Sequence, residues 1–201
     1  MFTGIVKGTA IVKSISKLNA YGLDTRMTVF LGALARGLKI GDSVSINGTC
    51  LTVASSIKGS ATFELVKETI DRTTFGQVKK GDRVNVERSL MLKDRLEGHL
   101  VLGHVDVVGE IFEVKKSSKG IKIWIKIAET EMRKHIVPKG SVTIDGISLT
   151  VVEVREDKFS VAMVPHTLLK TTIASKTRGD HVNIEYDILS KYVESLLPQK
   201  T

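Results

Sequence analysis

Apolar and polar residues alternate along most of this chain, and a period of two is typical of β-strands that bury one face. Val, Ile and Thr dominate these stretches, and glycines separate them. The expected strands span residues 4–15, 43–56, 60–66, 83–88, 104–114, 121–127, 141–154, 158–164 and 181–187. Lys58 and Gly59 predict a hairpin between two of these strands. Gly48 and Gly146, inside long strands, predict bends at barrel corners.

The strand pattern occurs twice. GDSVSINGTCLTV at 41–53 matches KGSVTIDGISLTV at 139–151, and the offset is 146 − 48 = 98 residues. The same offset relates KETIDRTT to PHTLLKTT and GDRVNVE to GDHVNIE. A repeat of this length is the size of a domain, so the chain is expected to hold two copies of one small domain. Many short strands with glycine-rich turns predict an all-β protein with a closed antiparallel barrel or a sandwich in each half.

The pattern also divides the chain. We expect an N-terminal copy of the β domain over residues 1–97, a C-terminal copy over 98–187 and a separate helix over 188–201. Short helical patches are expected at 31–38 and 129–136, at matching positions in the two halves.

The tail breaks the strand period. Ile188, Tyr192, Val193, Leu196 and Leu197 fall on one face at helical spacing, and the proline at position 198 ends the pattern. Such a helix can pack on its own barrel or against copies of itself. We favour self-association, because the first half has no equivalent helix, so this helix is not part of the repeated domain.

Composition narrows the function. The net charge is +8, but the lysines are scattered and aromatic residues make up only 5%. Binders of single-stranded nucleic acid interleave basic and aromatic residues, so we do not expect a nucleic-acid partner. A basic protein that handles a polar or anionic small molecule is the simpler interpretation.

Apolar runs, the first residues and the cysteine content indicate where in the cell the protein works. No apolar run approaches the roughly 20 residues of a membrane span, so no membrane partner is expected. The first residues lack the basic leader and long apolar stretch of a secretory signal. Cys50 is the single cysteine, so no intrachain disulfide can form, which suits the cytoplasm.

Equivalent positions of the two halves carry different polar groups: Cys50 corresponds to Ser148, Asn47 to Asp145 and Glu68 to His166. Gly4-Ile5-Val6 also resembles Gly103-His104-Val105. This substitution of one chemically capable group for another predicts two related pockets that bind similar ligands in different roles.

Each candidate also has a simpler interpretation. Cys50 lies in an apolar strand, where an inert thiol is common. His99 and His104 lack the further ligands that zinc requires, although either could carry a proton. Asp145 is placed to form a turn, and Lys139 to be a surface cation.

Taken together, the motifs are specific. MFTGIV, NGTCLTV, VNVERSL, GHLVLGHVD, KGSVTIDGISLTV and VNIEYDILSKYVE resemble riboflavin synthases of the trimeric, duplicated-barrel family, in order and over the whole chain. The resemblance implies two six-stranded Greek-key barrels and a C-terminal helix that joins three chains. It implies a working site between the N-terminal barrel of one chain and the C-terminal barrel of its neighbour.

The resemblance also implies the last reaction of riboflavin biosynthesis. A four-carbon unit moves from one molecule of 6,7-dimethyl-8-ribityllumazine to another, giving riboflavin and 5-amino-6-ribitylaminouracil. Neither a metal nor an organic cofactor is implied, and association with lumazine synthase is left open.

Site residues are carried over by the same resemblance. The first pocket would use Gly4, Ile5, Val6, Cys50, Leu51, Thr52, Glu64, Leu65, Val66, Lys67, Glu68 and Thr69. The second would use His104, Val105, Asp106, Lys139, Ser148, Leu149, Thr150, Ala162, Met163, Val164, Pro165, His166 and Thr167. Residues expected to matter for turnover are Ser43, Cys50, His104, Asp145 and Ser148.

The chemistry suggests roles for some of them. The C7 methyl of the substrate is a carbon acid, and we expect His104 to be its base. Cys50 or Ser148 would supply or position a nucleophile at the acceptor ring. His166 departs from the glutamate that bacterial relatives often place there, which puts the contacts of that pocket in doubt.

Two other functions compete. A non-catalytic carrier of lumazine or flavin would have the same barrels but would lose the reactive residues of one half. A barrel that docks on nucleic acid or on another protein would show salt-sensitive binding.

Overall fold

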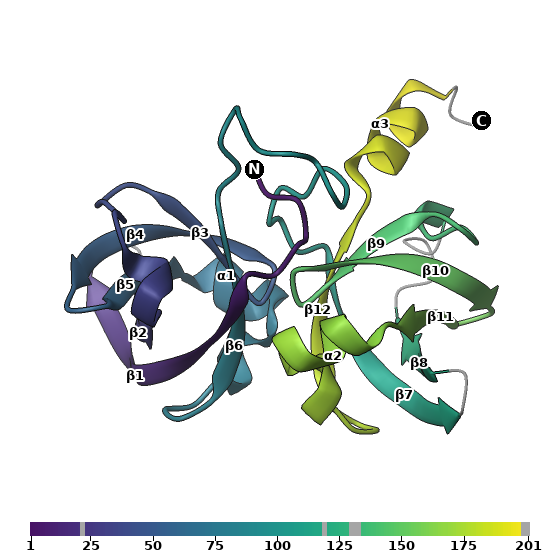
Figure 1. The fold of residues 1–201 in the computed structure, drawn as a ribbon, viewed down its shortest axis with the longest axis horizontal. Coiled ribbons are helices and arrows are strands. Elements are labelled where there is room, and N and C mark those ends of the chain that lie inside the picture. Colours follow the sequence, from purple (N-terminus) through teal and green to yellow (C-terminus); the bar gives the residue numbers. More distant parts are fainter. Residues whose placement is uncertain (21–22, 118–119, 129–133, 198–201) are drawn as a thin grey trace.

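The computed structural model describes residues 1–20, 23–117, 120–128 and 134–197. These residues form two closed six-stranded antiparallel barrels side by side, followed by a C-terminal helix, so the expected all-β fold is confirmed (Figure 1). None of the described helices has the length and apolarity that crossing a membrane requires.

The N-terminal barrel closes in the order β1-β2-β5-β4-β3-β6. Strands β3, β4 and β5 form consecutive hairpins, and β6 returns beside β3, which is a Greek-key connection. Its strands are β1 (Gly8–Ala20), β2 (Leu23–Phe30), β3 (Ser43–Ile46), β4 (Thr49–Ile57), β5 (Ser60–Val66) and β6 (Arg83–Arg88). Its short helices are η1 (Gly32–Ala35), α1 (Lys67–Arg72) and η2 (Thr74–Gln77).

The C-terminal barrel has the same connections and closes as β10-β11-β8-β7-β12-β9. Its strands are β7 (Val107–Ser117), β8 (Gly120–Lys126), β9 (Ser141–Ile144), β10 (Ile147–Arg155), β11 (Lys158–Met163) and β12 (His181–Tyr186). Its helices are α2 (Pro165–Lys170) and η4 (Thr172–Ser175), and α3 (Ile188–Leu196) follows the barrel. Each barrel encloses its own apolar core.

The structure corrects several expected elements. Gly48 and Gly146 do not bend long strands. Asn47 and Gly48 have φ values of 45° and 78°, and Asp145 and Gly146 have values of 46° and 79°. Positive φ at both central residues is typical of a two-residue hairpin turn, so each expected strand is two strands.

Other differences concern short elements. The expected helix at 31–38 is only the turn η1, and most of the patch at 129–136 lies outside the described residues. Strand β2 and helices α1 and α2 were not expected as such. The buried face of β2 includes Thr25, which weakens its alternation, and α1 and α2 are too short for a helical period.

The two barrels meet across an interface that repeats the duplication. The side chain of Asn85 donates to the carbonyl of Asp145 at 2.8 Å, and that of Asn183 donates to the carbonyl of Asn47 at 2.8 Å. Each asparagine also accepts a hydrogen bond from a backbone N–H of the other barrel. The two halves are therefore related by an approximate two-fold arrangement, with matched polar groups satisfying one another.

The two hairpin turns touch at the centre of this interface. A Cβ added to Gly48 would lie 2.6 Å from the Gly146 nitrogen, and one added to Gly146 would lie 2.8 Å from the Gly48 nitrogen. Only glycine fits there, because both the positive φ and the backbone contact exclude a side chain.

Gly48→Ala is expected to lower the free energy of unfolding by about 3 kcal/mol or more, because the backbones must separate as well as tolerate positive φ. Gly37→Ala is the matched control: Gly37 has φ +69° and nothing within 4 Å of an added Cβ. That control should cost only about 1–2 kcal/mol. Urea unfolding of both variants measures the difference, and equal losses would show that the contact between the turns is unimportant.

Candidate functional site

Cys50 and Ser148, two of the predicted reactive residues, lie on the outer faces of the barrels. Along β4, Leu51 and Val53 are buried in the core, so the alternate residues Cys50 and Thr52 face outward. Ser148 and Thr150 have the same placement on β10. The candidate site is therefore carried on the outer surface of each barrel, beside the hairpin turns that meet at the interface.

The segment before β1 crosses to the other barrel. The carbonyl of Gly4 accepts a hydrogen bond from the Ser148 N–H at 2.8 Å. A Cβ on Gly4 would lie 2.6 Å from the Ser148 Cβ, and φ at Gly4 is +75°. Val6 packs against the core of the C-terminal barrel. The start of the chain is thus part of the Ser148 surface.

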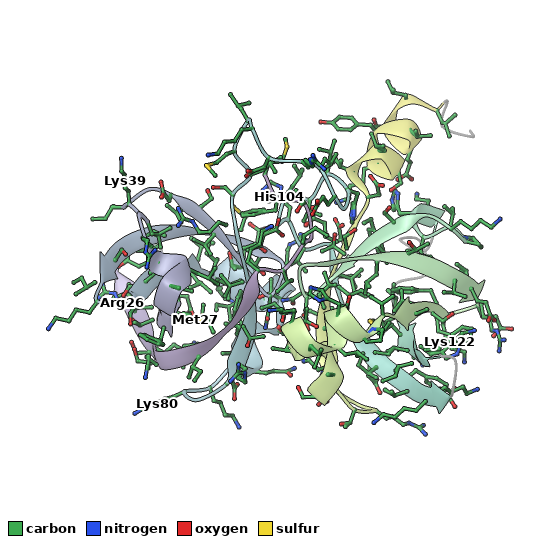
Figure 2. All side chains as sticks on the ribbon, in the orientation of Figure 1. Arg26, Met27, Lys39, Lys80, His104 and Lys122 are labelled. Atoms are coloured by element: carbon green, nitrogen blue, oxygen red, sulfur yellow. The ribbon has the colours of Figure 1, made fainter. Side chains whose placement is uncertain are left out.

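The segment before β7 makes the reverse crossing. The carbonyl of Gly103 accepts from the Cys50 N–H at 2.8 Å, and a Cβ there would lie 2.7 Å from the Cys50 Cβ. His104 follows directly and is exposed where the two barrels meet (Figure 2). His104 is therefore brought to the surface that carries Cys50.

This exchange corrects the grouping of the predicted residues. The sequence interpretation placed Gly4, Ile5 and Val6 with Cys50, and His104 with Ser148. The structure places Gly4 against Ser148 and Gly103 against Cys50. The reason is that the segment before the first strand of each half lies against the barrel of the other half. We call the two groups the Cys50 half-site (Cys50, Gly103, His104) and the Ser148 half-site (Ser148, Gly4, His99).

Two buried glutamates hold the crossing segments. Glu87 on β6 accepts from the N–H groups of Thr3 and Gly4 at 2.8 and 3.0 Å and from the Thr3 hydroxyl at 2.8 Å. Glu185 on β12 accepts from the N–H groups of Leu102 and Gly103 at 2.7 and 2.8 Å. Each barrel thus positions the segment that completes the half-site of the other.

Burial affects the charge of both glutamates. It raises the pKa of Glu185 to about 7, against hydrogen bonds from Leu102 and Gly103 that lower it. Burial also raises the pKa of Glu87, and its hydrogen bonds from Thr3 and Gly4 oppose this shift.

His99 is a functional candidate that the predicted site residues did not include. Its Nδ1 lies 2.7 Å from the Ser148 hydroxyl and its Nε2 lies 3.1 Å from the Thr143 hydroxyl. Burial lowers the pKa of His99, which favours the neutral ring. A neutral imidazole has one donor and one acceptor nitrogen, so it can accept the Ser148 proton while donating to Thr143. The GHLVLGHVD motif contained this histidine but gave no sign of its partner.

Other predicted residues are engaged in different ways. Glu64 pairs with Arg26 at 2.6 Å on the outer face of the N-terminal barrel. The predicted residues that follow Val66 and Val164 form the starts of helices α1 and α2. Lys139 is exposed in a turn with φ 68°. Among the described residues, no group of three or more His, Cys, Asp or Glu side chains is arranged to hold a metal ion.

Asp145 and Ser43 differ in their surroundings. Ser43 is partly exposed on β3, opposite Thr52 of β4. Asp145 is 1% exposed, and its Oδ1 accepts from the Asn183 N–H at 2.8 Å. Its Oδ2 has no hydrogen-bond partner and lies 3.9 Å from the Lys176 ammonium. Asp145 is therefore buried at the barrel interface.

The comparison with known families gives the class of protein to which these two barrels belong. The lumazine binding domain family matches residues 3–89 and 102–187, one match for each barrel. The LumP structure complexed with riboflavin has the same fold, with a TM-score of 0.83 at 24% identity, covering 92% of this chain and 99% of LumP.

The sequence relatives define the family more closely. Riboflavin synthase of Photobacterium phosphoreum is 42% identical over 198 residues, covering 98% of this chain and 89% of that protein. Riboflavin synthase of Escherichia coli (strain K12) is 41% identical over 187 residues, 93% of this chain and 87% of that protein. That of Bacillus subtilis (strain 168) is 36% identical over 197 residues, with 98% and 90% covered. The chain belongs to the riboflavin synthase family.

Asp145→Asn is expected to stabilise the protein above pH 6. Burial raises the pKa of Asp145 from 3.8 to about 6, so its charged form is disfavoured in the folded state. The contribution of Asp145 to the stability of the wild-type chain should thus fall as the pH rises from about 4 to 6, by up to about 3 kcal/mol, and then stay level. The variant should lack this loss, because an amide does not ionise. Asn47 already fills the equivalent position of the first half with a neutral amide.

Urea unfolding at pH 4 and pH 8 measures the effect, with little difference from wild type at pH 4. Asn47→Asp is the opposite control and should lose stability at pH 8. If Asp145→Asn were less stable at pH 8, the attraction to Lys176 would outweigh the burial of the charge.

Proposed function

We propose that the chain catalyses the last step of riboflavin biosynthesis, in which two molecules of 6,7-dimethyl-8-ribityllumazine give riboflavin and 5-amino-6-ribitylaminouracil. The observation that carries this proposal is the pair of half-sites, which are equal in backbone and unlike in reactive side chains, in a member of the riboflavin synthase family. Two identical molecules that must play opposite parts need such a pair of unlike surfaces.

At the Cys50 half-site, His104 acts as the base that removes a proton from the C7 methyl of the donor molecule. Its exposure and its place next to Gly103 favour this role, because the ring is open to a ligand on the Cys50 surface. A positioned base of this kind typically contributes about 10²–10⁴ in rate. Cys50 and Thr52 form the wall of this half-site.

At the Ser148 half-site, a chain of hydrogen bonds from Thr143 through His99 prepares the Ser148 hydroxyl. A neutral His99 can take the proton of Ser148 or of a water that Ser148 holds, and so supply a nucleophile to the acceptor ring. The Cys50 half-site has no equivalent histidine behind its thiol among the contacts of the described residues. We assign the acceptor to the Ser148 half-site on this difference.

Orientation supplies much of the remaining rate. Holding two rings face to face can contribute roughly 7–11 kcal/mol to the barrier reduction. The substrate-binding residues are those predicted above for both pockets, regrouped so that 4–6 serve the Ser148 half-site and 104–106 serve the Cys50 half-site. No cofactor is part of this proposal.

We further propose a homotrimer in which the Cys50 half-site of one chain faces the Ser148 half-site of a neighbour. Helix α3 projects from the C-terminal barrel (Figure 1), and Leu189, Tyr192, Val193 and Leu196 are 58–83% exposed. No residue of α3 is buried within the chain. Such an apolar face favours association with copies of itself over packing on its own barrel. With one cysteine and no disulfide, the assembly suits the reducing cytoplasm.

A ligand carrier is the second candidate, because LumP shares the fold and its structures hold riboflavin or 6,7-dimethyl-8-(1'-D-ribityl) lumazine. The retention of reactive groups on both barrels argues for catalysis. A carrier needs one binding surface and has no use for the Ser148–His99 pair.

The purified chain incubated with the lumazine alone is expected to generate the absorbance of riboflavin. His104→Ala and Ser148→Ala should each lower turnover by about 10²-fold or more while the protein stays folded, because each removes a group that acts on a proton. Arg36→Ala is a control, because the Arg36 side chain is exposed and belongs to neither half-site. Tight binding without product would support the carrier, and near-wild-type turnover in both variants would overturn the assigned roles.

Removal of residues 188–201 is expected to yield monomers with little activity, because each chain then lacks the neighbour that completes its site. Light scattering gives the oligomeric state, and riboflavin formation gives the activity. Leu196→Ser with Leu197→Ser is a milder variant that should weaken assembly in the same direction. A fully active monomer would rule out a shared site.

A further inference from the structure

The two crossing segments are held alike but are charged differently. The N–H of Lys7 donates to the Val86 carbonyl at 2.9 Å, and the N–H of Asp106 donates to the Ile184 carbonyl at 2.8 Å. Since 86 + 98 = 184, Lys7 and Asp106 occupy equivalent positions beside Glu87 and Glu185. A cation in one copy is thus replaced by an anion in the other.

The replacement has opposite effects on the two glutamates. The positive charge of Lys7 lowers the pKa of Glu87 and partly offsets its burial. The negative charge of Asp106 raises the pKa of Glu185, in addition to the larger effect of burial. Without another cation, the second copy would hold two carboxylates side by side in a largely buried place.

Helix α3 supplies that cation. The Lys191 ammonium donates to the Asp106 Oδ1 at 2.7 Å, and the other oxygen of Asp106 accepts from the Tyr186 N–H at 2.8 Å. Lys191 also lowers the pKa of Glu185. The first copy has no such helix, and it needs none because Lys7 is already in place.

Lys191 is not required to seat the helix. Glu194 pairs with Lys134 and lies 2.9 Å from the Nε2 of His135, and the Ser190 hydroxyl lies 3.1 Å from the Nδ1 of His135. His135 is itself buried against Tyr186. These polar contacts are expected to keep one side of α3 on the C-terminal barrel when Lys191 loses its charge, while its apolar residues stay exposed.

We propose that Lys191 is a positioning residue for the Cys50 half-site: its ammonium balances Asp106 and Glu185 and so keeps Leu102 and Gly103 fixed over Cys50. The helix of the C-terminal barrel thereby sets the geometry of the half-site on the N-terminal barrel of the same chain. The inference rests on the proposed function only in treating Cys50 and His104 as part of a site.

The consequence of losing Lys191 follows from the hydrogen bonds. With Lys191 in place, Glu185 is mostly charged above pH 7. Next to an unbalanced Asp106 its pKa rises further, so above pH 7 the carboxylate takes up a proton and one of its oxygens becomes a donor. A carboxylate that accepted from two backbone N–H groups can no longer accept equally from both. Gly103 loosens, and the Cys50 side chain that it covers becomes more accessible.

Cys50 reports this change directly, because it is the only cysteine of the chain. Its rate of reaction with the neutral disulfide 4,4′-dithiodipyridine is measured on the whole chain at pH 8, where wild-type Glu185 is mostly charged, and without lumazine. Lys191→Met is expected to react about fivefold faster, as the net loss of one hydrogen bond would allow. Removal of a positive charge would by itself make the thiol less reactive, so the expected direction is opposite to a simple charge effect.

Three variants test the cause. Lys191→Arg keeps the charge and should stay within twofold of wild type. Lys7→Met is the matched control, since it affects the segment over Ser148, and it should leave the Cys50 rate within twofold. Lys191→Met with Asp106→Asn should return to near the wild-type rate, because the amide can still accept from Tyr186 and Glu185 no longer faces a second carboxylate.

Two results would overturn the proposal. One is an unchanged Cys50 rate in Lys191→Met. The other is a faster rate that Asp106→Asn fails to reverse, whether or not light scattering shows a loss of assembly; Lys191 would then be only a contact that seats the helix. Both results are independent of riboflavin formation by the wild-type chain, which tests the proposed function separately.

Discussion

The crossing of two glycine carbonyls between the barrels is the constraint on which the rest of the structure depends. The Gly4 carbonyl accepts a hydrogen bond from the strand that carries Ser148, and the Gly103 carbonyl accepts one from the strand that carries Cys50. Each glycine belongs to the other half of the chain. Neither half-site exists in an isolated barrel, so the duplication is more than two domains in a row. The interface between the barrels and the candidate site are built from the same residues.

This arrangement explains why charged groups are buried so close to the site. Thr3, Gly4, Leu102 and Gly103 lie outside the barrel strands, so without the two glutamates their N–H groups would be left unsatisfied on entering the interface. Glu87 and Glu185 satisfy two or three donors each, which compensates for the burial of their charge. The raised pKa of both groups shows that the compensation is incomplete. Nearby cations therefore matter more here than at an exposed ion pair.

The sequence was sufficient for the parts of the fold that depend on local pattern. Alternation and the 98-residue repeat predicted two copies of a β domain, each a barrel or a sandwich, and the resemblance implied the barrel. Helical spacing predicted α3. The crossing could not be found from local pattern, because Gly4 and Ser148 are far apart in the sequence and nothing near either residue indicates their contact. The resemblance named the segments 4–6 and 104–106 but grouped them by half, whereas the contacts place Gly4 against Ser148 and Gly103 against Cys50. His99 was visible in its motif, but its role depends on Thr143 and Ser148, which only the fold brings to it.

The comparison of the two copies separates what the fold requires from what the chemistry requires. Asn85 and Asn183, Gly48 and Gly146, and Glu87 and Glu185 are identical because each makes the same backbone contact across the interface. The residues that differ, such as Cys50 and Ser148, face outward from strands of equal geometry. A shared frame with unlike side chains allows two identical ligands to be treated differently without any change of backbone. The exception is Asp106, where the frame itself differs in charge, and there the second copy depends on a helix that the first copy does not have.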